Sequence, residues 1–248
     1  MILVLPLVFL PGLALGSFLG VVAARVPLRR SIVRPGSACM SCETPIRWYD
    51  NVPVLSYTVL RGRCRSCGTR IPPRDLAIEL STALLLVGCV LAFGLSAKTA
   101  AAAIACGAFV VATATDLERR IVPNRVVLPA AAAVLALQTA FHPSPEWALG
   151  AVGGAGFFFL AALAYPGGMG MGDVKLALLI GALLGKTTPV AIMLGLFLAL
   201  VPSLVLIARH GTRARRLAIP FAPFLAAGAV IALFAGEPIL RAYLHHLT

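Results

Sequence analysis

Charged residues, and acidic residues above all, are scarce in this sequence. Only 12% of its 248 residues are charged, against about 25% in typical soluble domains. Asp and Glu together number nine, whereas hydrophobic residues make up 60% of the chain. A soluble protein with an unusually large core is the alternative, but so little charge indicates that most of the surface faces lipid. The composition therefore predicts an integral membrane protein.

Several other features are missing. The N-terminal segment lacks a basic stretch and a convincing small-residue cleavage site, which indicates a retained helix rather than a cleaved signal peptide. Outside 25–75, no hydrophilic stretch is long enough to form a separate soluble domain. No glycine-rich nucleotide-binding loop follows an expected strand, and no internal repeat is evident.

Long apolar runs predict an all-α membrane protein with about eight transmembrane helices, since about 20 apolar residues are needed to cross the hydrocarbon layer. The chain then divides into a first transmembrane helix (1–24), a cytoplasmic loop (25–75) and a helical membrane domain (76–248). Span 173–185 would be only about 20 Å long, so neighbouring helices must shelter it or the bilayer must thin. The expected spans are 3–24, 76–95, 99–115, 126–141, 148–165, 173–185, 189–208 and 217–236.

Basic residues set the expected orientation. A net charge of +12 would suggest nucleic acid as a partner in a soluble protein, but here the basic residues fall in short loops between apolar runs. We therefore expect a lipid bilayer and no nucleic acid. All Lys and Arg residues fall on one side of the eight-span arrangement except Lys98, Lys186 and Arg241. Because positive residues favour the cytoplasm, the N-terminus is expected outside and 25–75, with ten arginines, inside.

Two aspartates stand where apolar spans meet the same side of the membrane. Asp116 closes the alanine-rich third span, and Asp173 opens the sixth span in the sequence Gly170-Met171-Gly172-Asp173. Two spans lie between them, and this even number returns both aspartates to the cytoplasmic face. Charged residues near membrane depth are costly and indicate function.

Paired carboxylates can hydrolyse peptides without a metal. The ionised carboxylate acts as the base toward water, and the protonated carboxylate polarises the scissile carbonyl. Glycine at 170 and 172 would allow a substrate backbone to approach Asp173 closely. The structural alternative is that each aspartate marks a helix end, with Asp173 favoured by the helix dipole.

Four cysteines occur in the 25–75 loop as two C-x-x-C pairs, Cys39 with Cys42 and Cys64 with Cys67. Two such pairs at this spacing are typical of a tetrahedral zinc site, and Gly68 suits the turn after the second pair. Disulfides are the alternative, but a reducing cytoplasm disfavours them. A site closed by four thiolates would be structural rather than catalytic. Zinc would fold a loop that has too little apolar content to fold unaided.

These motifs together resemble the type IV prepilin peptidases, which are bifunctional leader peptidases and N-methyltransferases. The resemblance runs through nearly the whole chain and combines the cysteine loop with a G-x-G-D box. The similar stretches are G-S-F-L at 16–19, PIRWYDNVPVLSY at 45–57, R-G-R-C at 61–64, G-M-G-D-V-K-L at 170–176 and I-P-F-A-P-F at 219–224.

The resemblance implies that Asp116 and Asp173 are the catalytic pair of an aspartic endopeptidase in the bacterial inner membrane. It implies that basic leaders of prepilin and pseudopilin precursors are cleaved after a glycine at the cytoplasmic face. It further implies methylation of the new N-terminus by S-adenosylmethionine, although no residue can be assigned to the methyl donor from chemistry.

Two other classes of function stay open at this point. A proton- or cation-coupled transporter could use the aspartates, with the zinc loop as a regulatory module, but no internal repeat or further intramembrane charge marks a pathway. A scaffold for a secretion complex would need neither aspartate.

Overall fold

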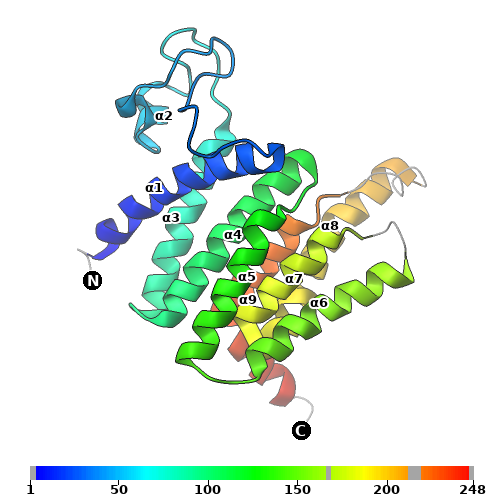
Figure 1. Ribbon diagram of the computed structural model, residues 1–248. Helices are drawn as coiled ribbons and strands as arrows, with labels where there is room; N and C mark the ends of the chain where they lie inside the picture. The colour runs from blue at the N-terminus through cyan, green and yellow to red at the C-terminus, as the bar shows by residue number, and fades with distance from the viewer. Residues whose placement is uncertain (1–3, 166–168, 212–218, 246–248) are drawn as a thin grey trace. The chain divides into compact units, whose positions relative to one another are not determined.

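The computed structural model describes residues 4–165, 169–211 and 219–245, which form helices and connecting loops without a β-strand (Figure 1). The expected all-α fold is confirmed. The chain forms two compact units, one reaching to Gly94 and the other starting at Leu95. This division groups the helix that follows the cysteine loop with the first helix of the chain.

In the first unit, two long helices pack against each other and the cysteine loop connects them. Glycines on the first of these, α1, allow the close approach. A Cβ atom added at Gly12 would lie 2.8 Å from Ala83 Cα, and one at Gly16 would lie 2.6 Å from Glu79 Cα. The elements of this unit are α1 (Val4–Arg25), η1 (Val26–Leu28), η2 (Trp48–Asn51), α2 (Leu55–Val59) and α3 (Pro73–Phe93).

The second unit is a helical bundle around α4 and α7. Ser96 caps the start of α4 by accepting a hydrogen bond from the Thr99 N–H, and Arg120 ends this helix in the left-handed conformation at φ 55°. Pro123, three residues later, is the N-cap of α5, so a turn of a few residues reverses the chain. The elements are α4 (Ala97–Arg119), α5 (Asn124–Phe141), α6 (Glu146–Ala164), α7 (Met171–Leu184), η3 (Gly185–Thr187), α8 (Thr188–His210) and α9 (Ala222–His245).

Helix α7 is short and mostly buried. Its 14 residues span about 21 Å, less than the hydrocarbon layer of about 30 Å. Neighbouring helices shelter it, as expected, and α6 lies closest to it: a Cβ atom added at Gly181 would lie 2.0 Å from the Gly150 carbonyl oxygen. Small residues thus bring α6 and α7 into backbone contact, and Gly150 has a packing role.

Seven helical stretches among the described residues are long and apolar enough to cross a membrane. One of them, Met171–Arg209, has 39 residues and combines α7, η3 and α8. Each expected span thus corresponds to one helix, of which α7 is too short to qualify alone. Residue 3 of the first expected span and residues 217–218 of the last lie outside the described residues.

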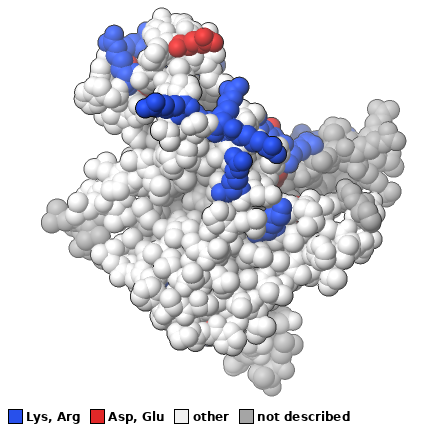
Figure 2. Space-filling view, in the orientation of Figure 1, with Lys and Arg blue, Asp and Glu red and all other residues white. Residues whose placement is uncertain are grey.

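Apolar side chains cover the outside of these helices. Leu149 and Leu160 on α6 are 69% and 66% exposed, and Val201 on α8 is 64% exposed. In Figure 2 most of the helical surface is uncharged, and the Lys and Arg side chains lie over the cysteine loop and around helix ends. This distribution is that of a multi-pass membrane protein.

Candidate active site and metal centre

Asp116 lies in the last turn of α4 and is buried. Its Oδ2 atom accepts a hydrogen bond of 3.0 Å from the backbone N–H of Ala222, the first residue of α9. The backbone of Phe221 interacts with the same carboxyl group. Since the first N–H groups of a helix lack partners within the helix and favour negative charge, the start of α9 fixes the orientation of the Asp116 carboxylate.

Asp173 is the third residue of α7 and is half-buried. Its backbone N–H donates to the Gly170 carbonyl at 3.1 Å, which forms the first turn of the helix. The residue before Asp173, Gly172, contacts Val122 in the turn that follows α4. The end of α4 and the start of α7 therefore bring both aspartates to the same end of the second unit, as the two intervening helices α5 and α6 require.

The two glycines before Asp173 have different roles. A Cβ atom added at Gly172 would lie 2.8 Å from Val122 Cβ, so this glycine allows α7 to approach the turn between α4 and α5. The prediction that Gly172 lets a substrate backbone approach Asp173 stays a prediction, and the structure adds a packing role. At Gly170 an added Cβ atom would lie 3.7 Å from Asp173 Oδ2, an ordinary contact distance. Gly170 thus borders the carboxyl group.

Sequence reasoning missed several residues around this pair. Lys175 Nζ donates a hydrogen bond of 2.9 Å to Asn124 Oδ1, which joins α7 to the start of α5. The backbone donors at Phe221 and Ala222 were also missed, although the stretch 219–224 contributed to the family resemblance. A backbone N–H has no signature of its own in a sequence, so only the prolines at 220 and 223 could have indicated a helix start there.

The four cysteine sulfurs of the 25–75 loop form a cluster. All four Sγ atoms lie within 4.8 Å of one another, and Cys39 Sγ is 3.8 Å from Cys67 Sγ. Four sulfurs at about 2.3 Å from one zinc ion would lie about 3.8 Å apart in a tetrahedron. A disulfide needs about 2.05 Å, and all four thiols are free. The cluster could therefore hold a metal ion, and its four thiolates suit zinc.

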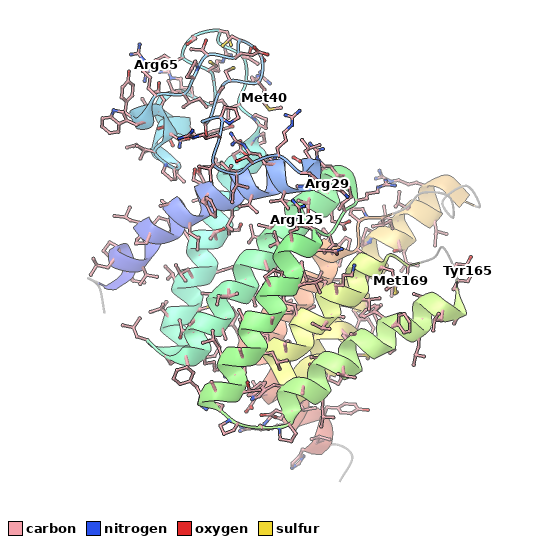
Figure 3. The ribbon with its side chains drawn as sticks, in the orientation of Figure 1. Arg29, Met40, Arg65, Arg125, Tyr165 and Met169 are labelled. Atoms are coloured by element: carbon pink, nitrogen blue, oxygen red, sulfur yellow. The ribbon has the colours of Figure 1, made fainter. Side chains whose placement is uncertain are left out.

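Two similar turns present these cysteines. The N–H of Cys39 donates to the Thr44 carbonyl and the N–H of Cys64 to the Thr69 carbonyl, at 3.0 and 2.8 Å. After the second pair, Gly68 takes a φ of 72°, as expected for a tight turn. Met40 and Arg65, each the residue after the first cysteine of a pair, lie on this loop in Figure 3.

Threonines behind the cluster prepare the sulfurs for a metal. The Thr69 hydroxyl lies 3.3 Å from Cys67 Sγ, and the Thr44 hydroxyl lies 3.3 Å from Cys42 Sγ. The hydroxyl and the backbone of Thr69 lower the pKa of Cys67 to about 6, and those of Thr44 lower the pKa of Cys42. Because the thiolate is the form that binds metal, these hydrogen bonds favour the ligating state of Cys42 and Cys67, the second cysteine of each pair.

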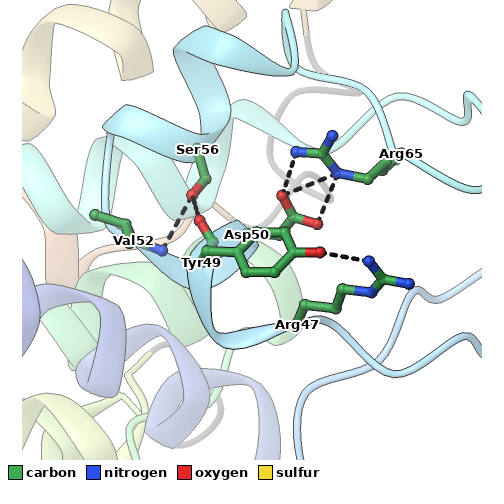
Figure 4. Close-up of polar contacts among 6 residues, drawn as sticks. All are labelled: Arg47, Tyr49, Asp50, Val52, Ser56 and Arg65. Atoms are coloured by element: carbon green, nitrogen blue, oxygen red, sulfur yellow. Dashed lines mark hydrogen bonds and ion pairs between the residues drawn. The ribbon is translucent and has the colours of Figure 1, made fainter.

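An ion pair connects the segment between the cysteine pairs to the second pair (Figure 4). Arg65 binds the Asp50 carboxylate through Nε at 2.9 Å and Nη2 at 2.7 Å, and this contact lowers the pKa of Asp50. Arg47 donates to the Tyr49 hydroxyl, and Ser56 Oγ donates to the Tyr49 carbonyl at 2.9 Å. The loop thus has a defined fold around the cluster.

Glu79 on α3 anchors the same segment and was not singled out from the sequence. Its buried carboxylate accepts a hydrogen bond of 2.8 Å from the Val54 N–H and interacts with the Ser17 side chain. Val54 has a φ of 60°, which is strained for a β-branched residue. An acid inside an apolar span is unusual, and this could have flagged Glu79.

Comparisons with known proteins give consistent matches along the chain. Family models match residues 10–93 as "Bacterial Peptidase A24 N-terminal domain" and residues 103–207 as "Type IV leader peptidase family". The chain is similar to the prepilin leader peptidase/N-methyltransferase of Bacillus subtilis, at 34% identity over 97% of the chain and 98% of that protein.

Other relatives carry the same name. The protein from Burkholderia pseudomallei is 33% identical over 92% of the chain and 84% of its own length. The protein from Neisseria gonorrhoeae is 31% identical over 96% of the chain and 92% of its own length. No solved structure gives a significant match.

Proposed function

The chain belongs to the type IV leader peptidase family and is an enzyme of that family, and we propose that it is an aspartic endopeptidase that removes the basic leader of prepilins and pilin-like precursors. Asp116 and Asp173 are the proposed catalytic pair. The observation that carries this proposal is the hydrogen bond from the start of α9 to Asp116, which orients this carboxylate at the end of α4, where the start of α7 brings Asp173 next to the α4–α5 turn.

The proposed reaction uses one water molecule and one shared proton. The ionised carboxylate takes a proton from water as the oxygen attacks the scissile carbonyl carbon, and the protonated carboxyl group donates to the carbonyl oxygen. The tetrahedral intermediate then collapses and the C–N bond breaks. The carboxyl group that took a proton from water gives it to the leaving amine, and the other carboxylate takes its proton back from the hydroxyl that becomes the new carbonyl. Both carboxyl groups return to their starting state.

Backbone contacts suggest which aspartate is the base. Hydrogen-bond donors stabilise a negative carboxylate, and Asp116 accepts one from Ala222. Asp173 is half-buried and lies near the negative charge of Asp116. Both conditions favour the protonated form of its carboxyl group. We therefore assign the base to Asp116 and the proton donor to Asp173.

Topology supports cleavage at the cytoplasmic face of the inner membrane. The loops that precede α3 and α5 hold most of the arginines, and basic loops favour the cytoplasm. Both aspartates lie at the end of the second unit that carries the α4–α5 turn. A basic leader would stay in the cytoplasm while the apolar pilin helix lies in the bilayer. The scissile bond would then reach the membrane boundary, at the level of Asp116 and Asp173.

The four-cysteine loop is proposed to hold a structural zinc ion, since Cys39, Cys42, Cys64 and Cys67 leave no position open for substrate. The family names also support N-methylation of the new N-terminal amine, for which S-adenosylmethionine would supply the methyl group. Incubating the purified protein with a prepilin precursor tests both activities. Mass spectrometry is expected to show loss of the leader, and one added methyl group when the methyl donor is present; an uncut precursor would contradict the peptidase assignment.

A proline at position 222 tests the role of α9 in the active site. Ala222 is the first residue of its helix, a position where proline is tolerated, but proline has no N–H to donate to Asp116. We expect Ala222→Pro to lower kcat for leader removal about 10- to 100-fold, the range for a lost hydrogen bond to a charged group.

The matched control is Ala222→Gly, which keeps the N–H and is expected to stay within about threefold of the natural enzyme. Thermal unfolding of both variants checks that α9 still packs. If folded Ala222→Pro protein cleaved as fast as Ala222→Gly, the proposed role of the Ala222 N–H in orienting Asp116 would be wrong.

A further inference from the structure

A cavity in the first unit lies beside the point where the chain enters α3. It has a volume of about 480 Å³ and lies between the end of α2 and the start of α3. Its lining contains no acidic residue but includes three arginines and the aromatic ring of Tyr57. The lining residues are Tyr57, Arg61, Gly62, Arg63, Arg70, Ile71, Pro72 and Pro73.

The three arginines of this cavity have no anionic partner. Among the residues that the structure describes, none forms an ion pair or hydrogen bond with the Arg61, Arg63 or Arg70 guanidinium group. Arg65, in the same loop, is by contrast bound to the Asp50 carboxylate through two nitrogens. The cavity therefore gathers positive charge that the fold itself does not neutralise.

Backbone pairing holds two of these arginines opposite each other. Arg63 and Arg70 form an antiparallel bridge, and like charges directly opposite on paired strands are destabilising. The Gly62 carbonyl accepts a hydrogen bond of 2.7 Å from the Ile71 N–H, which continues this pairing. Tyr57 closes the cavity against Gly62, where an added Cβ atom would lie 2.9 Å from the ring. An anion between the guanidinium groups would offset the repulsion.

The surroundings identify the kind of anion. Pro73 is the first residue of an apolar helix that can cross the membrane, so the cavity lies at the level of lipid headgroups. Helix α2 provides Tyr57 to the cavity and exposes two apolar side chains one turn apart, Leu55 at 60% and Val59 at 67%. We propose that this cavity binds the phosphate headgroup of an anionic phospholipid, with the apolar side of α2 next to the acyl chains.

The site is distinct from both sites described above. It contains neither aspartate and none of the four cysteines, and its ligand follows from charge rather than from the peptidase assignment. S-adenosylmethionine is a poorer match, because its sulfonium and ammonium groups would lie among three arginines without an acid.

Binding of a short-chain phosphatidylglycerol to the purified, zinc-loaded full chain in detergent tests the proposal. The test variant is Arg63→Gln with Arg70→Gln. Its matched control, Arg29→Gln with Arg30→Gln, removes the same charge from the same loop outside the cavity. Since each basic residue near a membrane surface contributes about 1 kcal/mol toward anionic lipid, we expect the test variant to bind about 30-fold more weakly. The control is expected to change binding by less than about threefold.

Other ligands distinguish the source of the phosphate. Phosphatidylcholine of the same chain length is expected to bind far more weakly than phosphatidylglycerol, and soluble glycerol phosphate is expected not to saturate the site at the concentrations that suffice for the lipid. Equal losses in both variants would show a diffuse charge effect, and equal binding of glycerol phosphate would show a site for free phosphate. Displacement of the lipid by S-adenosylmethionine would assign the cavity to the methyl donor. Any of these three results overturns the proposal.

A measurement on the unaltered protein covers the case in which the test variant fails to fold. Phenylglyoxal modifies accessible arginines, and peptide mass spectrometry locates the modified residues. Phosphatidylglycerol is expected to slow modification of Arg63 and Arg70 at least fivefold relative to Arg29, whereas phosphatidylcholine is expected to leave the ratio unchanged. Equal rates with both lipids would contradict the proposal.

Discussion

Asp116→Asn and Asp173→Asn are each expected to abolish leader removal while leaving the protein folded. Asparagine matches the shape of aspartate, but it can neither take a proton from water nor hold the proton that the second carboxyl group donates. The remaining carboxyl group cannot act as base and acid in the same step. We expect the rate to fall about 1,000-fold or more, within the range for a lost acid–base group.

A nearby acid provides the control for these variants. Glu118 is two residues from Asp116 on the same helix and is exposed, and Glu118→Gln is expected to cleave within about threefold of the natural enzyme. Initial rates on a prepilin precursor and thermal unfolding should be measured for all three variants. Full activity in either aspartate variant would leave the proposed mechanism without its base or its acid.

Loss of the zinc ligands is expected to unfold the cysteine loop without unfolding the second unit. Elemental analysis of the purified chain should find about one zinc per molecule. The same analysis of the double variant, Cys64→Ser with Cys67→Ser, should find almost no zinc. Without the metal, the contacts around Asp50 and Arg65 cannot hold an arginine-rich loop together. Trypsin is therefore expected to cut within 29–74 at least about tenfold faster.

Cys106→Ala is the control for this pair of substitutions. Cys106 is buried in α4, far along the chain from the cluster, so this variant should keep its zinc and its resistance to trypsin. Four intact thiols with no bound metal in the natural protein would contradict the zinc assignment. Rapid digestion that occurs equally with and without metal would contradict its structural role.

The coarse fold could be predicted because the membrane restricts what a chain can do. Apolar runs of sufficient length become helices, and the number of helices between two polar sites fixes which side each site reaches. Counting spans in the sequence is therefore enough to place Asp116 and Asp173 at one end of the helices. The two C-x-x-C pairs are equally informative, because their spacing indicates four sulfurs around one ion.

Contacts made by backbone atoms and by close packing could not be predicted in this way. The N–H of Ala222 reaches Asp116 across 106 residues of sequence, and nothing in the identity of an alanine signals a donor. Gly172 packs against Val122, and this contact is set by how α7 meets the α4–α5 turn, which the sequence does not show. Glu79 was overlooked because its partner is the backbone N–H of Val54. A strained backbone conformation at Val54 directs this N–H toward the Glu79 carboxylate, and the sequence does not show that conformation.

The pH dependence of kcat/KM for leader removal by the natural enzyme tests the shared proton most directly. A pair that works with one proton between two carboxyl groups is active only when one is ionised and the other is not, so kcat/KM is expected to fall at both low and high pH. Asp116→Asn and Asp173→Asn should show no such maximum at any pH. A rate that rises steadily with pH and stays on a plateau would show that a single base suffices, and would contradict the proposed pair.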